Sequence, residues 1–335
     1  MISPITGKEM ILKREQRSLD FRKENFQVMY HYYLCTESGE QFTTTELDEL
    51  NMTQLYNQYR EKHNLPFPDE IKAIREKYGL SATKMSEILG FGINSYRNYE
   101  NGEVPSLANS RLIQIAKDPD KFKDLVALSA VLDEKQREKL IKKGNALIEE
   151  REHNYFTIEL QDYLLGKNIS DEYSGYRNPN LDKLTEMVVF FSAQLAPWKT
   201  KLNKLLFYAD FLLFNKTGYS MSGARYRAIN MGPVPNNFNS IFEYMANKDH
   251  IDIYITQFTK GGEGEQFKPH PNRKFNAELF NDTELSIINQ VAEKFKNIST
   301  AEMIEYCHKE KAWLDNEKER RLISYRDYGF ELSGI

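Results

Sequence analysis

Hydrophobic side chains recur every three or four residues along most of this chain, a spacing that predicts amphipathic helices. The strongest such stretches are residues 69–78, 107–117, 181–196 and 202–214. By contrast, residues 26–35 (FQVMYHYYLC) are dense in aromatic and aliphatic side chains and predict a strand. Residues 251–258 and 266–269 are expected to pair across a glycine-rich loop at 261–264. The pattern therefore predicts a mainly α protein, α+β overall, with a small β-rich N-terminal module and a small antiparallel β insertion in a C-terminal helical domain.

Residues 80–105 (LSATKMSEILGFGINSYRNYENGEVP) predict two short helices around a tight turn. Ser81 is placed to cap the first helix, and Gly90 and Gly92 bracket Phe91 in the turn. A second helix follows and ends at a glycine and a proline. This succession of elements predicts a helix-turn-helix.

The second of these helices has an apolar side and a polar side. Tyr96 and Tyr99 share the apolar side, and the outward side carries short polar and basic residues: Asn94, Ser95, Arg97 and Asn98. In the DNA major groove, Asn can bond bidentately to adenine and Arg to guanine. We therefore expect these four residues to face the major groove, with Thr83 and Lys84 near phosphates.

The same region resembles the phage-repressor (Xre) helix-turn-helix family, whose members typically read L-S-x-x-x-L-A-x-x-L-G…Y-E-N-G-x-x-x-P. The match runs without a gap from Leu80 to Gly102, with Ser86 at the family's small buried alanine position. The resemblance implies that this segment binds DNA. A helical hairpin that binds no DNA is the alternative.

The first 65 residues contain two matching turns. Ser3 and Thr6 form one pair of positions with two residues between them, Cys35 and Ser38 form another, and a glycine follows each pair. The arrangement resembles the N-terminal zinc module of MqsA-type antitoxins with its metal site dismantled. A structural zinc needs four sulfur or imidazole ligands in most proteins, and only the cysteine remains here. We therefore expect neither metal nor cofactor; two unrelated glycine turns are the alternative.

Changes in composition divide the chain into four predicted parts. They are a degenerate zinc-knuckle-like module at 1–65, the helix-turn-helix at 66–117, a helical connector and linker at 118–175, and a C-terminal domain at 176–335. The linker is predicted at 168–180, where Gly, Pro, Asn and Ser cluster. A dimerisation helix within 120–165 is the alternative to a connector.

The C-terminal domain contains three sequence blocks in order. They are Lys201–Asp210 (KLNKLLFYAD), Gly232-Pro233-Val234, and Cys307-His308 followed by Trp313. This order resembles the Panacea (SocA-like) domain, with Cys307 in place of the usual hydroxyl residue. The resemblance implies an antitoxin whose C-terminal domain binds a toxin. The expected partner contacts lie in loops and at strand ends: Tyr219, Arg225, Tyr226, Gly232, Pro233, Val234 and Pro235.

Composition narrows the class of protein further. The 335-residue chain is 40% hydrophobic, yet no apolar run approaches the roughly 20 residues of a membrane span. Two cysteines far apart in sequence indicate reduced thiols and a cytoplasmic protein. Residues 69–117 hold seven Lys or Arg against six Asp or Glu, so one such unit would attract DNA phosphates weakly. We therefore expect a homodimer that reads two half-sites.

The sequence contains no recognisable catalytic constellation. Its six histidines form no H-E-x-x-H motif, and Asp210, on a strongly apolar helix, is expected to pair with Arg225 or Arg227. We therefore predict that the protein is not an enzyme. The favoured reading is a type II antitoxin that binds its toxin through the C-terminal domain and represses its own operon through the helix-turn-helix. A stand-alone transcriptional regulator whose C-terminal domain senses a ligand or a protein is the alternative.

Overall fold

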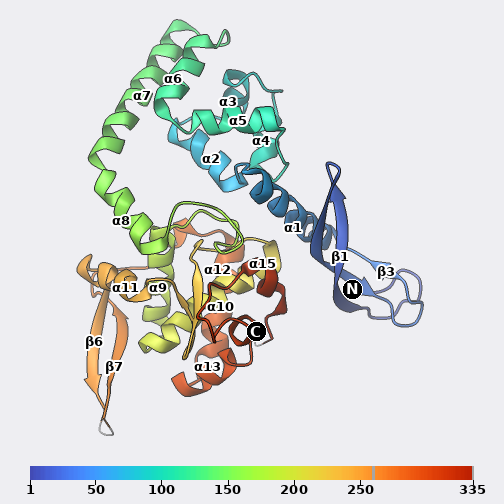
Figure 1. Ribbon diagram of the computed structural model, residues 1–335, viewed down its shortest axis with the longest axis vertical. Coiled ribbons are helices and arrows are strands. Elements are labelled where there is room, and N and C mark those ends of the chain that lie inside the picture. The colour runs from blue at the N-terminus through green and yellow to red at the C-terminus, as the bar shows by residue number, and fades with distance from the viewer. Residues whose placement is uncertain (259–260, 334–335) are drawn as a thin grey trace. The chain divides into compact units, whose positions relative to one another are not determined.

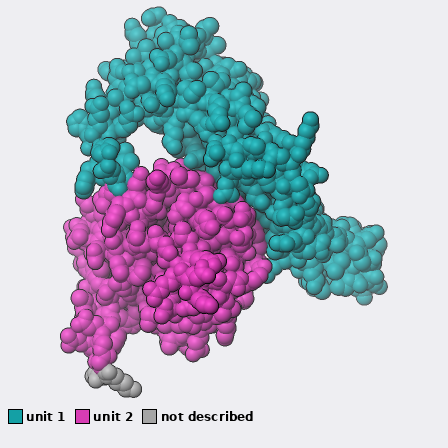
Figure 2. Space-filling view, viewed as in Figure 1, with its two compact units in different colours: residues 1–159 teal, residues 160–335 magenta. Residues whose placement is uncertain are grey.

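The computed structural model describes residues 1–258 and 261–333 of the chain (Figure 1). The chain forms two compact units, residues 1–159 (unit 1) and residues 160–335 (unit 2) (Figure 2). Helices make up 52% of the structure and strands 15%, which confirms the mainly α prediction. Within the described residues, no helix has the length and hydropathy that a membrane span requires.

Unit 1 begins with a long β-hairpin. Strand β1 (Ile11–Phe21) pairs antiparallel with β2 (Glu24–Leu34), and the short β3 (Gln41–Phe42) adds to the end of β2. The strand predicted at 26–35 is thus confirmed. A 19-residue helix, α1 (Thr45–His63), packs against β2, although the sequence analysis predicted a β-rich module here.

Helix α1 escaped prediction because part of its buried face is polar. The side chain of Asn51 bonds both the N–H and the carbonyl of His31, at 2.8 and 3.0 Å. The side chain of Gln54 does the same for Met29, at 2.9 and 2.8 Å. These amides occupy backbone groups of β2 that no strand among the described residues takes, so α1 closes an edge that would otherwise be open to another chain.

The rest of unit 1 is helical. Its helices are α2 (Pro68–Lys77), α3 (Ala82–Ile88), α4 (Ser95–Glu100), α5 (Leu107–Ala116), α6 (Pro119–Leu128) and α7 (Glu134–His153). The helices predicted at 69–78 and 107–117 are confirmed to within one residue at each end. Helix α8 (Tyr155–Leu165) contains the boundary between the two units.

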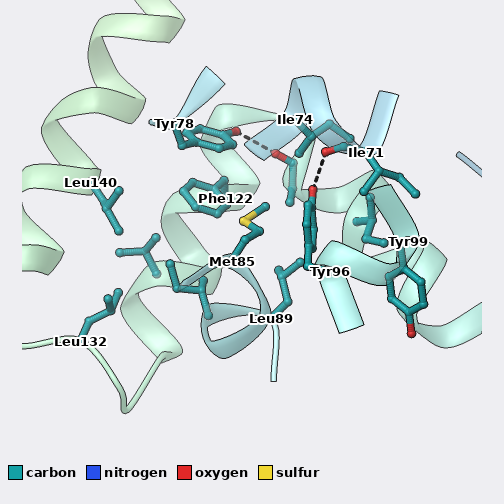
Figure 3. Packing of buried hydrophobic residues seen from close by; sticks show 14 residues of the cluster. Ile71, Ile74, Tyr78, Met85, Leu89, Tyr96, Tyr99, Phe122, Leu132 and Leu140 are labelled. Carbon is teal, nitrogen blue, oxygen red and sulfur yellow. Dashed lines mark hydrogen bonds between the residues drawn. The ribbon is translucent and has the colours of Figure 1, made fainter. Parts of the chain in front are cut away.

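One core joins the helix-turn-helix to the helices that follow it. Tyr78, the C-cap residue of α2, stacks on Phe122 of α6 with ring centroids 3.8 Å apart (Figure 3). Leu132 and Leu140, before and within α7, bury their side chains in the same cluster. Part of the segment predicted as a connector therefore packs into this core. The four-part domain division itself stays a prediction.

Unit 2 is built around a helix whose central residues are all buried. Every residue of α10 (Lys199–Thr217) from 201 to 214 is buried, which explains the wide apolar face seen in the sequence. The other helices of unit 2 are α9 (Leu181–Leu195), α11 (Phe238–Asn247), α12 (Asp282–Phe295), α13 (Thr300–Cys307), α14 (Lys311–Leu314) and α15 (Tyr325–Tyr328). The predicted pairing of β6 (Ile251–Gln257) with β7 (Glu263–Pro269) is confirmed.

Two loops predicted in this unit differ from expectation. Residues 232–235, expected among the partner contacts in loops and at strand ends, form a strand: β5 (Gly232–Pro235) pairs antiparallel with β4 (Tyr226–Ile229). Proline is tolerated there because β5 pairs on one side only. The predicted linker at 168–180 is instead a packed loop in which Ser174 and Tyr176 are buried. The prediction failed because a composition rich in glycine and proline indicates irregular backbone but does not indicate whether that backbone is exposed.

Candidate functional site

Helix α4 is held in place by contacts to both preceding helices. The Ser86 hydroxyl accepts a hydrogen bond from the Tyr96 N–H at 3.0 Å, which ties α3 to the start of α4. The Tyr96 hydroxyl donates to the Ile71 carbonyl at 2.7 Å, and burial raises the pKa of Tyr96, so the hydroxyl keeps its proton (Figure 3). Both oxygens of Glu100 accept from the Arg75 guanidinium, at 2.5 and 3.2 Å. The Y-E-N-G motif is therefore part of the support of α4.

The opposite side of α4 faces outward. Three of the four predicted base-reading residues are exposed, and Ser95 is half-buried; the exposed ones are Asn94, Arg97 and Asn98. Within the part of the chain that the structure describes, no residue bonds the side chains of these three. Thr83 and Lys84 are half-buried, and the Lys84 ammonium lies 2.7 Å from a Glu87 carboxylate oxygen. The predicted groups thus share one face, but Lys84 would have to leave Glu87 to contact a phosphate.

The two knuckle-like turns come together as a cluster of three hydroxyls and one thiol. Hydrogen bonds from Ser38, Thr6 and Ser3 lower the pKa of Cys35 to about 6, and the Thr6 hydroxyl lies 3.3 Å from the Cys35 sulfur. Neutral hydroxyls are poor ligands for zinc, so this donor set does not fit the metal. Among the described residues, no group of three or more His, Cys, Asp or Glu could hold a metal ion.

In unit 2, the buried carboxylate of Asp210 organises the chain that leads into β4. One of its oxygens accepts from the N–H groups of Met221 and Ser222, at 2.8 and 2.7 Å. The other accepts from the hydroxyls of Ser222 and Tyr226, at 2.6 and 2.8 Å. Burial raises the pKa of Asp210 above its ordinary value, and these four hydrogen bonds offset only part of that rise.

The predicted ion pair of Asp210 with an arginine is wrong. Arg225 instead lies 2.8 Å from an Asp171 carboxylate oxygen, and Arg227 donates to the Arg320 carbonyl at 2.6 Å. The four neutral donors already satisfy the carboxylate, so it needs no cation in the core.

Hairpin β4–β5 rests on a second buried polar side chain. The Lys204 ammonium donates to the Pro233 carbonyl at 2.9 Å, and burial lowers the pKa of Lys204 to about 8. Gly232 has a φ of +99°, and a Cβ there would lie 2.8 Å from the Lys204 Cε and 3.1 Å from the Cys307 Cβ. Glycine is therefore required for this close approach.

The last sequence block holds the turn between β4 and β5. The rings of His308 and Trp313 stack with centroids 3.8 Å apart. The Trp313 indole donates to the Ile229 carbonyl at 2.7 Å, and the His308 Nε2 lies 3.1 Å from the Asn230 carbonyl. Met231, at the tip of this turn, remains 54% exposed. All three Panacea-type blocks thus support one hairpin and its exposed tip.

Most of the residues expected to contact a partner are buried. Five of the seven lie in the interior of unit 2: Tyr226, Gly232, Pro233, Val234 and Pro235. They are interior because β4–β5 packs against α10 instead of projecting as a loop. Of the other two, Arg225 is half-buried in its ion pair, and Tyr219 is half-buried with the Arg177 guanidinium 4.4 Å from its ring centroid.

Sequence reasoning missed a groove of about 570 Å³ beside the hairpin tip. Trp198, Met231 and Phe258 form its apolar part. Lys199 and Glu263 are among the residues that form its polar part. The available signal was Met231 itself, an apolar residue between a strand and the Gly-Pro-Val sequence.

Two family models match the chain. The model described as the antitoxin component of a bacterial toxin–antitoxin system, MqsA, matches residues 1–127. The model described as antitoxin SocA-like, Panacea domain, matches residues 202–314. No curated protein matches the chain significantly.

These matches support an antitoxin of a toxin–antitoxin system. More particularly, the chain joins an MqsA-like antitoxin region to a SocA-like Panacea domain, as the sequence resemblances indicated.

Proposed function

We propose that this protein neutralises a cognate toxin by direct binding through residues 176–335 and represses its own operon through the helix-turn-helix. The observation that carries the proposal is the presence of two antitoxin-family regions in one chain. Toxin binding is assigned to unit 2 because the Panacea match lies within it and because it offers a groove with exposed apolar walls.

Operator binding is supported by the geometry of α4. Its exposed residues Asn94, Arg97 and Asn98 have no side-chain partner among the described residues, and its inner face is fixed by Ser86 and Glu100. A rigid helix with free amide and guanidinium groups suits base readout, at about 1–3 kcal/mol of discrimination for each good bidentate contact. The protein acts on DNA in the cytoplasm as a homodimer, because two half-sites compensate for the weak phosphate attraction of one unit.

The test is co-expression of the full-length chain with the product of the gene adjacent to its own. We expect the neighbouring product to stop growth when expressed alone, and growth to return when both proteins are made. The two proteins should also co-elute from a size-exclusion column as one complex. A folded full-length chain that neither restores growth nor forms the complex would contradict the proposal and favour a stand-alone regulator.

A further inference from the structure

We propose that the groove formed by Trp198, Met231 and Phe258 is the surface on which unit 2 docks its partner protein. We further infer that the partner inserts one apolar side chain there and places a basic side chain beside it. The inference rests on the proposed function, because the partner in question is the cognate toxin.

The groove gathers large apolar side chains from separate parts of unit 2. Met231 comes from the β4–β5 turn and is 54% exposed, and Phe258, directly after β6, is 46% exposed. Trp198, at the start of α10, lies with its ring centroid 5.4 Å from that of Phe258. Single exposed apolar residues are ordinary, but two of them beside a half-buried tryptophan, around one concavity, are typical of a binding surface.

The aromatic wall of the groove is fixed by the backbone beneath it. A Cβ on Gly264 would lie 2.5 Å from the Phe258 ring and 2.9 Å from the Trp198 ring, so both rings rest on the bare backbone of β7. Trp198 also forms an antiparallel bridge with Gln266. The wall therefore loses little conformational entropy when a partner binds.

The part of the groove that Met231 forms is fixed by the Panacea-type sequence blocks. Trp313 and His308 hold the two carbonyls that precede Met231, and Lys204 holds the carbonyl of Pro233. Met231 is left as an exposed apolar side chain at this tip, next to the exposed Asn230. A flexible thioether on a rigid turn can adapt to partner side chains of different shapes.

Charge at the groove favours a basic partner. Lys199 is occupied by Glu265, with 2.9 Å between the ammonium and a carboxylate oxygen. Glu263 is exposed and has no ion pair with any of the described residues. An unpaired carboxylate attracts a Lys or Arg and repels phosphates, so a protein partner fits this groove better than a nucleic acid does.

The experiment measures the affinity of the purified full-length chain for the adjacent gene's product by calorimetry. We expect Met231→Ser and Phe258→Ser each to weaken binding about tenfold or more, which is about 1.4 kcal/mol. Glu263→Lys should weaken binding and reduce its dependence on salt. The matched control is Ile255→Ser on β6, which removes a side chain that is 68% exposed but does not line the groove. We expect this control to bind like the wild type.

A fourth variant tests the groove's shape. Gly264→Ala removes none of the lining side chains but forces Phe258 and Trp198 to shift, so we expect weaker binding and a changed tryptophan emission spectrum. If the wild type binds and the groove variants bind equally well, the groove inference is wrong and the proposed function stands. The same conclusion follows if Ile255→Ser weakens binding as much as they do. If the wild type neither binds nor restores growth, the proposed function fails and the inference fails with it.

Discussion

The two units support their β-hairpins in opposite ways. In unit 1, the neutral amides of Asn51 and Gln54 bond the backbone of β2. In unit 2, Lys204 and Asp210, which have ionisable side chains and are fully buried on α10, hold β4–β5 and the chain that leads into it. A neutral amide costs less to desolvate than a charged group, and a buried ionisable group is especially costly unless every partner is present.

This difference indicates where each unit tolerates change. The polar contacts of unit 1 can be lost one at a time, because each is worth about 1 kcal/mol. Those of unit 2 form a connected set: Asp210, Tyr226 and Lys204 fix the hairpin whose tip carries Met231. We therefore expect substitutions within that set to affect both the stability of unit 2 and the binding of a partner.

The largest expected effect comes from Asp210→Ala. Four donors would lose their acceptor in a buried site, at about 1–3 kcal/mol each, so unit 2 should lose at least about 3 kcal/mol of stability. Both tryptophans, Trp198 and Trp313, lie in unit 2, so tryptophan fluorescence during urea unfolding reports on this unit. The matched control is Asp162→Ala, an exposed carboxylate that should change stability by less than about 0.5 kcal/mol. If the two substitutions lower stability equally, unit 2 does not depend on the buried Asp210 carboxylate more than on an exposed one.

A pair of glycine substitutions gives the next largest difference. Gly232→Ala meets Lys204 and Cys307 in a left-handed conformation and should cost about 2–3 kcal/mol. Gly39→Ala, in a knuckle turn of unit 1, has a φ of +76° but open space around it, so only about 1 kcal/mol of backbone strain is expected. Calorimetry measures the stability of both variants and checks this order. If both lose the same stability, Lys204 and Cys307 can shift to accommodate a Cβ at position 232.

Much of this structure follows from its sequence. The strongly periodic helices α9 and α10, the β6–β7 hairpin and the two short helices α3 and α4 were predictable because their apolar spacing or turn residues have few alternatives. Helix α1 was not predictable, because Asn51 and Gln54 face inward and bond strand β2. Polar residues on a buried face interrupt the spacing of apolar residues that predicts a helix.

The site was predictable only in part. The outward face of α4 follows from helical geometry, since Tyr96 and Tyr99 had to turn inward. The groove could not be inferred, because it depends on a tertiary approach of Met231 to Trp198 and Phe258 across distant segments. The partners of Asp210 were missed because they are neutral groups, such as the Ser222 hydroxyl. A search of the sequence for an oppositely charged residue cannot find such partners.

Substitutions on the outer face of α4 should change binding and leave stability unchanged. Asn94→Ala and Arg97→Ala should each weaken binding to the operon's promoter DNA by about 1–3 kcal/mol, because each removes one base contact. Neither side chain has a partner among the described residues, so the melting temperature should not fall. Fluorescence anisotropy with labelled promoter DNA measures the affinity, with Arg111→Ala on α5 as a control that removes the same charge outside α3 and α4. If a variant that carries both substitutions binds the promoter DNA as tightly as the wild type, the assignment of base contacts to α4 is wrong.

The smallest expected effect is that of a chelator on the native protein. Cys35 with three hydroxyls does not fit zinc, so purified protein should contain well under one zinc per chain and its unfolding should not shift with chelator. Replacing Ser3, Thr6 and Ser38 by cysteine supplies four thiolates at the same positions. That variant should bind about one zinc and lose stability when the metal is removed. Elemental analysis of both proteins decides the matter, since stoichiometric zinc in the native chain would place the ligands elsewhere, for instance at His31 with Cys35. If the triple variant folds and still takes no zinc, the two turns do not have knuckle geometry.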